Sequence, residues 1–319
     1  MSPIPIILDI DPGIDDTLAL ILAVKSKAFD IKGLTICSGN VDSEQGVKNA
    51  AYILDFLDVN HIPIYQGPVH TLYPDYTDAR DTHGEDGLGE AVFADSGQAQ
   101  ALPAYQYIIQ QLNQSPNTIT LVALGPLTNL ALAEQAQPGI LKKAKEIRIM
   151  GGVHTVQGNC SAVAEYNFWC DPDAARIVFN ADLPETYLYP LDVTYDILMT
   201  PAIRELINQF NTPLSQLIHK ITRFYVDFHW KVERTLGCVI NDPLVIADSI
   251  QPITHFKRAH IQIKTQGTNR GQGVTEFTPN GSIHVGVEVN ALAFFDYFLR
   301  TLFPEFEADI TLFQNKISK

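Results

Sequence analysis

A cluster of four aspartates near the start of the chain has the residue types and spacing of a cation site. It lies in DIDPGIDD, residues 9–16, directly behind an apolar stretch. Carboxylates this close together repel one another, and neutralising them through raised pKa values would cost several kcal/mol in total. A hard divalent cation removes that cost, and oxygen ligands suit Ca²⁺ or Mg²⁺ better than zinc. The Pro-Gly bend between Asp11 and Asp16 can aim both carboxylates at one point, which predicts such a site.

Two other interpretations fit parts of this segment. One aspartate could cap the following helix, where the helix dipole favours negative charge, while the others are solvated. This suits any single aspartate but is weak for all four. A strand ending in DxD is also typical of phosphatases and phosphotransferases with an aspartyl nucleophile. Against that class, Pro12 and Gly13 stand where it expects Thr or Val beyond the second aspartate, and no later Lys-then-DD segment follows.

Short β-branched runs alternate with helix-like segments through the first half of the chain and would position these carboxylates. The predicted strands are 4–10, 31–36, 118–123 and 146–150, and the predicted helices are 15–25, 43–57 and 127–135. Strands that are apolar throughout and alternate with helices predict a mainly parallel sheet with helices on both faces. We therefore expect a Rossmann-like α/β fold, in which functional sites lie at the carboxyl ends of the strands.

The pattern changes further along the chain. Residues 67–103 form a long connection rich in Gly, Asp, Tyr and Thr, which indicates a functional or a disordered segment. Helical stretches follow at 201–210 and 213–236, and alternating segments then predict a small antiparallel addition before a final helix beginning near Ala291. Because no internal repeat or low-complexity linker interrupts the sequence, we expect a single domain over residues 1–319.

The composition narrows the class of protein. The 319 residues include 22 Lys and Arg against 36 Asp and Glu, and the resulting formal charge of −14 repels phosphate backbones and anionic lipids. We therefore expect neither a nucleic-acid partner nor a membrane partner. No apolar run approaches the ~20 residues of a membrane span, and the start of the chain does not have the pattern of a signal peptide. The four cysteines form no CxxC pair, so we expect a cytoplasmic protein with reduced, mostly buried cysteines.

The aspartate segment resembles the signature of a known family. DIDPGIDD fits every fixed position of DxDPGxDD, the signature of the inosine-uridine type nucleoside hydrolases. Five further segments follow in the order of that family: HGEDGLG, ALGPLTNLAL, IMGG, GNCSAVAEYNFWCDPDAA and NDP. The resemblance implies a Ca²⁺-dependent enzyme that hydrolyses the N-glycosidic bond of a small-molecule ribonucleoside to ribose and free base, in purine or pyrimidine salvage. It also implies a homodimer or homotetramer.

The resemblance further implies roles for individual residues. The residues that it places on the cation are Asp11, Asp16, Asp242 and the backbone carbonyl of Leu124. The residues that it places on the substrate are Asp15, Asn40, Met150, Asn159, Glu165 and Asn167. Asp9 matches neither set, and we expect it to hold the loop in place without binding the cation itself.

The chemistry of N-glycoside hydrolysis explains why such residues are needed. Breaking the bond leaves an oxocarbenium-like sugar, so the site needs a water nucleophile on one face and stabilisation of positive charge. Ca²⁺ lowers the pKa of a bound water, and we expect Asp11 to take its proton as the general base. Carboxylates and amides on the ribose hydroxyls then hold the sugar close to its transition-state geometry.

One position departs from the family pattern. Many members have HDP where this chain has NDP, and that histidine is a favoured proton donor to the departing base. Asn241 stands in its place and can hydrogen-bond a base but cannot protonate it at neutral pH. Three outcomes are open. Another residue could protonate the departing base, the preferred base could leave with little protonation, or the protein could be a catalytically weak or inactive ribosyl-binding protein.

Two histidines are candidates for a catalytic role beside the base. His83 in THGEDGLG matches a family histidine that reaches into the base pocket. His229 lies four residues before Glu233, the spacing at which two helical side chains interact. The alternative for His229 is a half-buried position on an amphipathic helix. Tyr225 and Trp230 are expected to pack in the core and receive no role.

Overall fold

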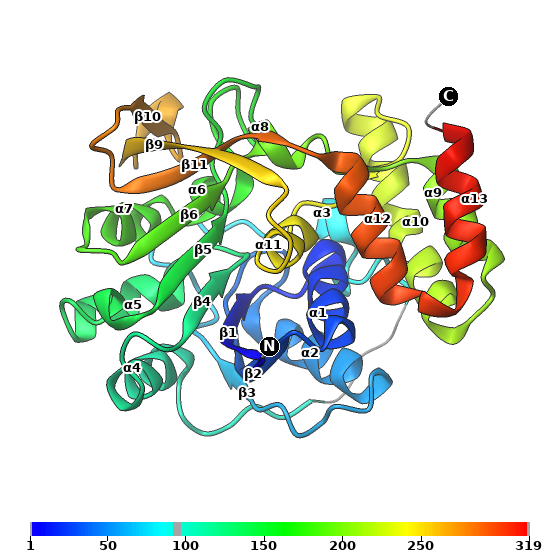
Figure 1. Cartoon of the computed structure of the whole chain (residues 1–319). Coiled ribbons are helices and arrows are strands. Elements are labelled where there is room, and N and C mark those ends of the chain that lie inside the picture. Colours follow the sequence, from blue (N-terminus) through cyan, green and yellow to red (C-terminus); the bar gives the residue numbers. More distant parts are fainter. Residues whose placement is uncertain (1, 92–96, 318–319) are drawn as a thin grey trace.

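The predicted sheet is the centre of the fold. In this computed structural model, which describes residues 2–91 and 97–317, nine of the described strands form one sheet in the order β10-β9-β11-β6-β5-β4-β1-β2-β3 (Figure 1). The strands are β1 (Ile4–Ile10), β2 (Phe29–Ile36), β3 (Ile64–Gln66), β4 (Thr120–Ala123), β5 (Glu146–Met150), β6 (Glu185–Tyr189), β9 (Thr254–Ile263), β10 (Gly273–Phe277) and β11 (Ile283–Val289).

The pairing of the strands confirms the predicted α/β class. Strands β1 to β6 pair in parallel with one another, and β11 is parallel to β6, whereas β9 is antiparallel to both β11 and β10. The predicted antiparallel addition therefore extends one edge of the main sheet. A separate small sheet pairs β7 (Leu198–Met199) with β8 (Cys238–Val239).

Helices cover both faces of the sheet because the strands are apolar on both sides. In β1, Ile6 and Leu8 join the core on one face, and Ile7 joins the core on the other. The helices of the first face are α1 (Ile14–Ser26), α2 (Ser43–Phe56), α11 (Pro243–Asp248) and α12 (Ala291–Leu302). The helices of the second face are α4 (Ala104–Gln114), α5 (Thr128–Ala136) and α7 (Pro172–Asn180).

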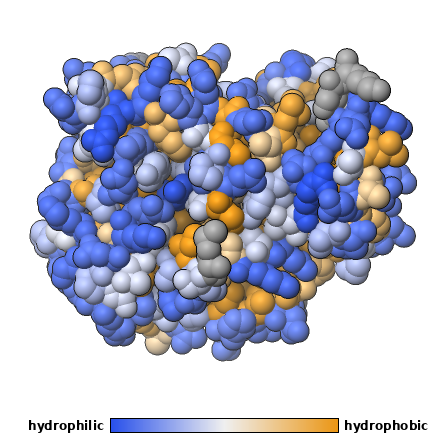
Figure 2. All heavy atoms as spheres, in the orientation of Figure 1, coloured by the Kyte–Doolittle hydropathy of each residue, from blue (hydrophilic) through white to orange (hydrophobic). Residues whose placement is uncertain are grey.

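The remaining helices lie around this sandwich. They are α3 (Arg80–His83), α6 (Tyr166–Cys170), α8 (Leu191–Thr194), α9 (Pro201–Gln209), α10 (Pro213–Glu233) and α13 (Glu307–Ile317). Hydrophilic side chains cover most of the face seen in Figure 2, which agrees with the acidic composition. Within the described helices, none combines the length and the apolar character that crossing a bilayer requires.

Several boundaries differ from the predictions. Helix α10 ends at Glu233 instead of residue 236 because Arg234 adopts a left-handed conformation with φ 59°. The long connection 67–103 contains the short helix α3, and its residues 92–96 lie outside the described part of the chain. Of the four cysteines, all free as expected, Cys160 is exposed and the others are buried.

Candidate active site

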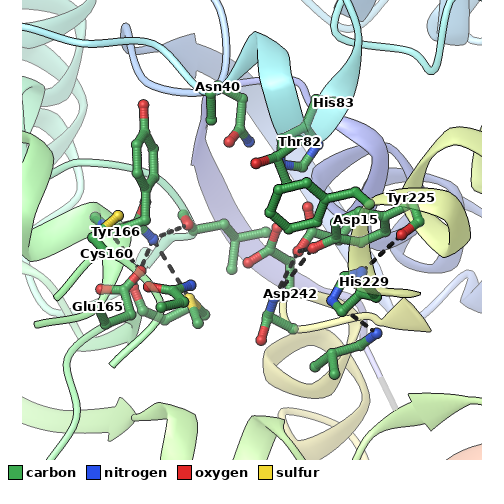
Figure 3. A pocket seen from close by; sticks show the side chains of 18 of the residues that line it. Asp15, Asn40, Thr82, His83, Cys160, Glu165, Tyr166, Tyr225, His229 and Asp242 are labelled. Atoms are coloured by element: carbon green, nitrogen blue, oxygen red, sulfur yellow. Dashed lines mark hydrogen bonds between the residues drawn. The ribbon is translucent and has the colours of Figure 1, made fainter. Parts of the chain in front are cut away.

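A pocket lies where the loops after β1, β2, β4 and β5 meet, at the carboxyl edge of the sheet (Figure 3). Helix α10 and residues 239–242, which precede α11, close it from the carboxyl-terminal half of the chain. Most of the residues predicted for the site line this pocket: Asp15, Asn40, His83, Leu124, Met150, Asn159, Glu165, Asn167, His229, Asn241 and Asp242. The other two, Asp11 and Asp16, are buried in the loop that bounds it. The fold thus brings together segments more than 200 residues apart.

A buried carboxylate cluster forms part of the pocket floor. Oxygen atoms of Asp15, Asp16 and Asp242 all lie within 4.8 Å of one another, and all three residues are buried. Asp16 is held by three donors: the backbone N–H groups of Asp11 at 3.1 Å and Gly13 at 3.2 Å, and the Asn40 side chain at 2.9 Å. Asp16 thereby fixes the bend that follows β1.

Asp11 lies directly beside this cluster. Its Oδ2 accepts a hydrogen bond from the backbone N–H of Asn40 at 2.7 Å. Its Oδ1 is buried and has no hydrogen-bond partner among the described residues. A Cβ at Gly39 or at Gly125 would come within 2.0 or 2.1 Å of its oxygens, so only glycine allows these two loops to close over the carboxylate.

Charge and burial make this cluster unfavourable unless a cation is bound. Burial raises the pKa of Asp16 to about 7, with repulsion from Asp15 adding to the effect. Burial, reinforced by the neighbouring aspartates, also raises the pKa values of Asp11 and Asp242 well above their ordinary range. The orphaned oxygen of Asp11 and the all-oxygen donor set fit a hard divalent cation. The residues present are therefore suited to the predicted kind of metal.

Asp9 lies behind the cluster, as expected for a supporting residue. Its Oδ1 accepts hydrogen bonds from Thr35 Oγ1 at 2.6 Å and Asn129 Nδ2 at 2.8 Å. These contacts join β1 to β2 and to α5. Burial raises the pKa of Asp9 to about 7.

Glu165 and Asn167 organise the opposite wall of the pocket. Glu165 caps α6, and its carboxylate accepts hydrogen bonds from the backbone N–H groups of Asn167 at 2.7 Å, Gly152 at 2.8 Å and Phe168 at 3.3 Å. Asn167 donates its side-chain amide to the carbonyls of Leu124 at 2.7 Å and Met150 at 3.3 Å. Because its NH₂ group is engaged there, the oxygen Oδ1 of Asn167 remains available as an acceptor.

Removing the Glu165 carboxylate should destabilise the fold through these three backbone contacts. We expect Glu165→Ala to lower the free energy of unfolding by about 1–3 kcal/mol, because a cap and charge-assisted hydrogen bonds are lost. Burial raises the pKa of Glu165 to about 7, which means that burying the carboxylate costs free energy in the folded protein. Removing the carboxylate also removes this cost, so the net loss of stability stays modest. Glu165→Gln retains an acceptor oxygen and should lose less than half as much. Urea unfolding with unchanged m-values measures both, and equal losses in the two variants would contradict the capping role.

The other end of the pocket is aromatic. The ring centroids of His83 and Tyr225 are 5.1 Å apart, and those of Tyr225 and His229 are 4.5 Å apart (Figure 3). The predicted His229–Glu233 pair is present at 4.0 Å. However, His229 Nδ1 donates to the Tyr225 carbonyl at 2.8 Å, and its Nε2 accepts from the backbone N–H of Val239 at 3.4 Å. Both ring nitrogens of His229 therefore bind the backbone.

His83 is oriented by the loop of the aspartate cluster. Its Nδ1 accepts a hydrogen bond from the backbone N–H of Ile14 at 3.0 Å. The hydrogen of the neutral imidazole consequently lies on Nε2. Burial lowers the pKa of His83, which favours this neutral form.

Tyr225 is a pocket residue that the sequence did not identify. Its hydroxyl donates to Asp15 Oδ2 at 3.3 Å, and Asn241 Nδ2 donates to the same oxygen at 3.0 Å. Tyr225 precedes His229 by one helical turn, and this i,i+4 spacing was the signal available for placing Tyr225 on the pocket face of α10.

The expectation that Trp230 packs in the core is wrong, because 48% of its surface is exposed.

Comparisons with known proteins agree with this geometry. The model of the inosine-uridine preferring nucleoside hydrolase family matches residues 6–296. A probable uridine nucleosidase 2 of Arabidopsis thaliana is 32% identical over 90% of this chain and 94% of its own length. The pyrimidine-specific ribonucleoside hydrolase RihB of Escherichia coli is 36% identical over 77% of this chain and 78% of its own. The purine-preferring ribonucleoside hydrolase of Gardnerella vaginalis superposes with a TM-score of 0.87 at 30% identity, covering 95% and 99% of the two chains.

Fold, pocket and relatives together define an enzyme that hydrolyses the N-glycosidic bond of ribonucleosides. The chain belongs to the inosine-uridine preferring nucleoside hydrolase family. The resemblance inferred from the DxDPGxDD signature is thereby confirmed, and the aspartyl phosphatase interpretation is not supported.

Proposed function

We propose that this protein is a Ca²⁺-dependent ribonucleoside hydrolase that releases ribose and free base, with Asp11 as the general base. The observation that carries the proposal is the buried cluster of Asp15, Asp16 and Asp242 on the pocket floor, beside the unpartnered Oδ1 of Asp11. A purely structural role leaves this concentration of buried negative charge without compensation.

Asp11, Asp16, Asp242 and the Leu124 carbonyl would hold the cation. The Leu124 oxygen accepts one hydrogen bond from Asn167, and its second lone pair remains for a metal. When bound, the cation lowers the pKa of a water molecule and holds it in place. Asp11 Oδ1 is the carboxylate oxygen positioned to accept the proton of that nucleophile, because Oδ2 is occupied by Asn40.

The acceptors in the pocket match the hydroxyl groups of a ribose. Asn40 donates its NH₂ to the Asp11 carbonyl at 3.2 Å and to Asp16 at 2.9 Å, so its Oδ1, like that of Asn167, remains an acceptor. Asp15, Asn159 and Glu165 complete the set of polar residues proposed to bind the sugar, and Met150 lines the same pocket. Sugar hydroxyls donate to such oxygens, and nearby carboxylates stabilise the positive charge that develops on the ribosyl group.

At the aromatic end, we propose that His83 contacts the base through its Nε2–H. A neutral imidazole can donate a hydrogen bond to a base as the glycosidic bond lengthens. The relatives include pyrimidine-specific and purine-preferring enzymes, so both classes of base belong in the test of this site.

A substrate panel tests the proposal. Reducing sugar should be released from at least one of inosine, uridine and cytidine, with one equivalent of base, and a strong chelator should abolish the release. A generic phosphate ester serves as the control and should not be turned over. Absence of sugar release from every nucleoside, with ribose still bound, would instead favour the ribosyl-binding protein.

A further inference from the structure

Among the described residues at the aromatic end of the pocket, His83, Tyr225, His229 and Asn241 are not arranged to give a full proton to a leaving base. Asn241 has replaced the histidine of the family pattern, and its NH₂ group is directed to Asp15. The single N–H of His229 binds the Tyr225 carbonyl, and the Tyr225 hydroxyl binds Asp15. His83, with its hydrogen on Nε2, can donate a hydrogen bond but is held in its neutral form.

Asn241 instead presents an acceptor. Asn241 is only 9% exposed and lines the pocket, and its Oδ1 has no partner among the described residues. Rotating the amide by 180° would place this oxygen against the Asp15 carboxylate, which is repulsive, so the hydrogen-bond network fixes the orientation. The negative end of an amide dipole therefore remains for the substrate.

The acidic residues of the pocket also favour a substrate with positive charge. Its lining includes the carboxylates of Asp15, Glu165, Glu233 and Asp242, whereas no lysine or arginine occurs among the lining residues that the structure describes. A divalent cation would offset only part of this charge. Such a pocket favours a positively charged ligand over a neutral one of the same shape.

We propose that this site prefers ribonucleosides whose base is N-alkylated and already cationic, such as 7-methylpurine or N-ribosylpyridinium compounds. This inference rests on the proposed hydrolase function and deepens it by naming a substrate class. Asn241 is its specificity-determining residue, because it offers an oxygen acceptor where an acid would be needed for a neutral base.

The reaction balances without an acid. The C1′–N bond breaks heterolytically, and its electron pair returns to the ring, which departs as a neutral molecule. Water adds to C1′ to give ribose, and the proton that the water loses passes to Asp11 and then to solvent. A neutral purine or pyrimidine would depart as an anion unless it received a proton at the same time.

Inosine and 7-methylinosine form a matched pair for the test, since they differ in one methyl group, and 7-methylinosine is a cation when the assay is run below the pKa of its N1–H. We expect kcat/KM for 7-methylinosine to exceed that for inosine by roughly 100-fold or more in the wild-type protein. In Asn241→His, kcat/KM for inosine should rise at least about tenfold while that for 7-methylinosine stays level or falls, so the ratio narrows. A wild-type ratio below about 3, or a ratio unchanged in Asn241→His, would overturn the proposal.

Binding to an inactive variant separates this inference from the proposed function. Calorimetry on Asp11→Asn with Ca²⁺ present should show that 7-methylinosine binds at least about tenfold more tightly than inosine. This result would stand even if neither compound were hydrolysed, and it does not depend on the folding of Asn241→His. Equal affinity for the two nucleosides would contradict the charge preference.

Discussion

Asp11→Asn is expected to reduce kcat for ribonucleoside hydrolysis by roughly 10³-fold, within the range that loss of a general base produces. The substitution keeps the size of the side chain and an oxygen for the Asn40 N–H, so the local fold should persist. It removes the buried carboxylate oxygen that has no other hydrogen-bond partner among the described residues. Reducing-sugar release at saturating substrate and Ca²⁺ measures the effect.

A matched control distinguishes this loss from a general effect of reduced charge. Asp55 lies on α2, is exposed, and is absent from the described lining of the pocket. Asp55→Asn should therefore leave kcat within about twofold of the wild type. Retention of more than a tenth of the activity in Asp11→Asn would count against Asp11 as the base.

Asp242→Ala is expected to weaken Ca²⁺ binding by at least about 100-fold, since it removes a charged ligand from a buried site. Asp242 directly precedes α11 and is the member of the carboxylate cluster that comes from the second half of the chain. Its loss leaves only Asp11, Asp16 and the Leu124 carbonyl of the residues proposed to hold the cation.

Thermal unfolding gives a second readout of the same change. A ligand that binds only the folded protein stabilises it by about 2.7 kcal/mol at 100 times its Kd, so Ca²⁺ should raise the Tm of the wild type. The Tm of Asp242→Ala should respond only at far higher Ca²⁺ concentrations. An equal Tm increase in both proteins at the same Ca²⁺ concentration would show that the cation binds elsewhere.

The parts of the fold with a strong local pattern were predictable. β1 and β5 agree with their predicted limits, because β1 is almost entirely apolar, β5 alternates polar residues with isoleucines, and a turn follows each strand. The strand β6 was missed, since Glu185 and Thr186 interrupt its apolar character and prolines flank it. Its place beside β5 comes from long-range pairing, which no local pattern contains.

The same limit applies to the site. The aspartate segment could be interpreted as a cation site because its like charges are close together in sequence, and the structure places two of them, Asp15 and Asp16, in a buried cluster with Asp242. The contacts of Asp15 with Tyr225 and Asn241 join positions 210 and 226 residues apart. The periodicity of α10 indicates only which side chains share a face of the helix, and it does not indicate which distant residues they contact. The engagement of both His229 nitrogens depends on Val239 in the neighbouring strand, which local sequence could not show.

A Ca²⁺ titration of chelator-stripped protein tests the central claim most directly, with binding followed by calorimetry and sugar release measured on the same samples. The proposed site predicts one Ca²⁺ ion bound per chain, almost no sugar release before the titration, and activity that rises in proportion to occupancy. Full activity in excess chelator, or Ca²⁺ binding that leaves sugar release unchanged, would contradict a catalytic cation at the aspartate cluster.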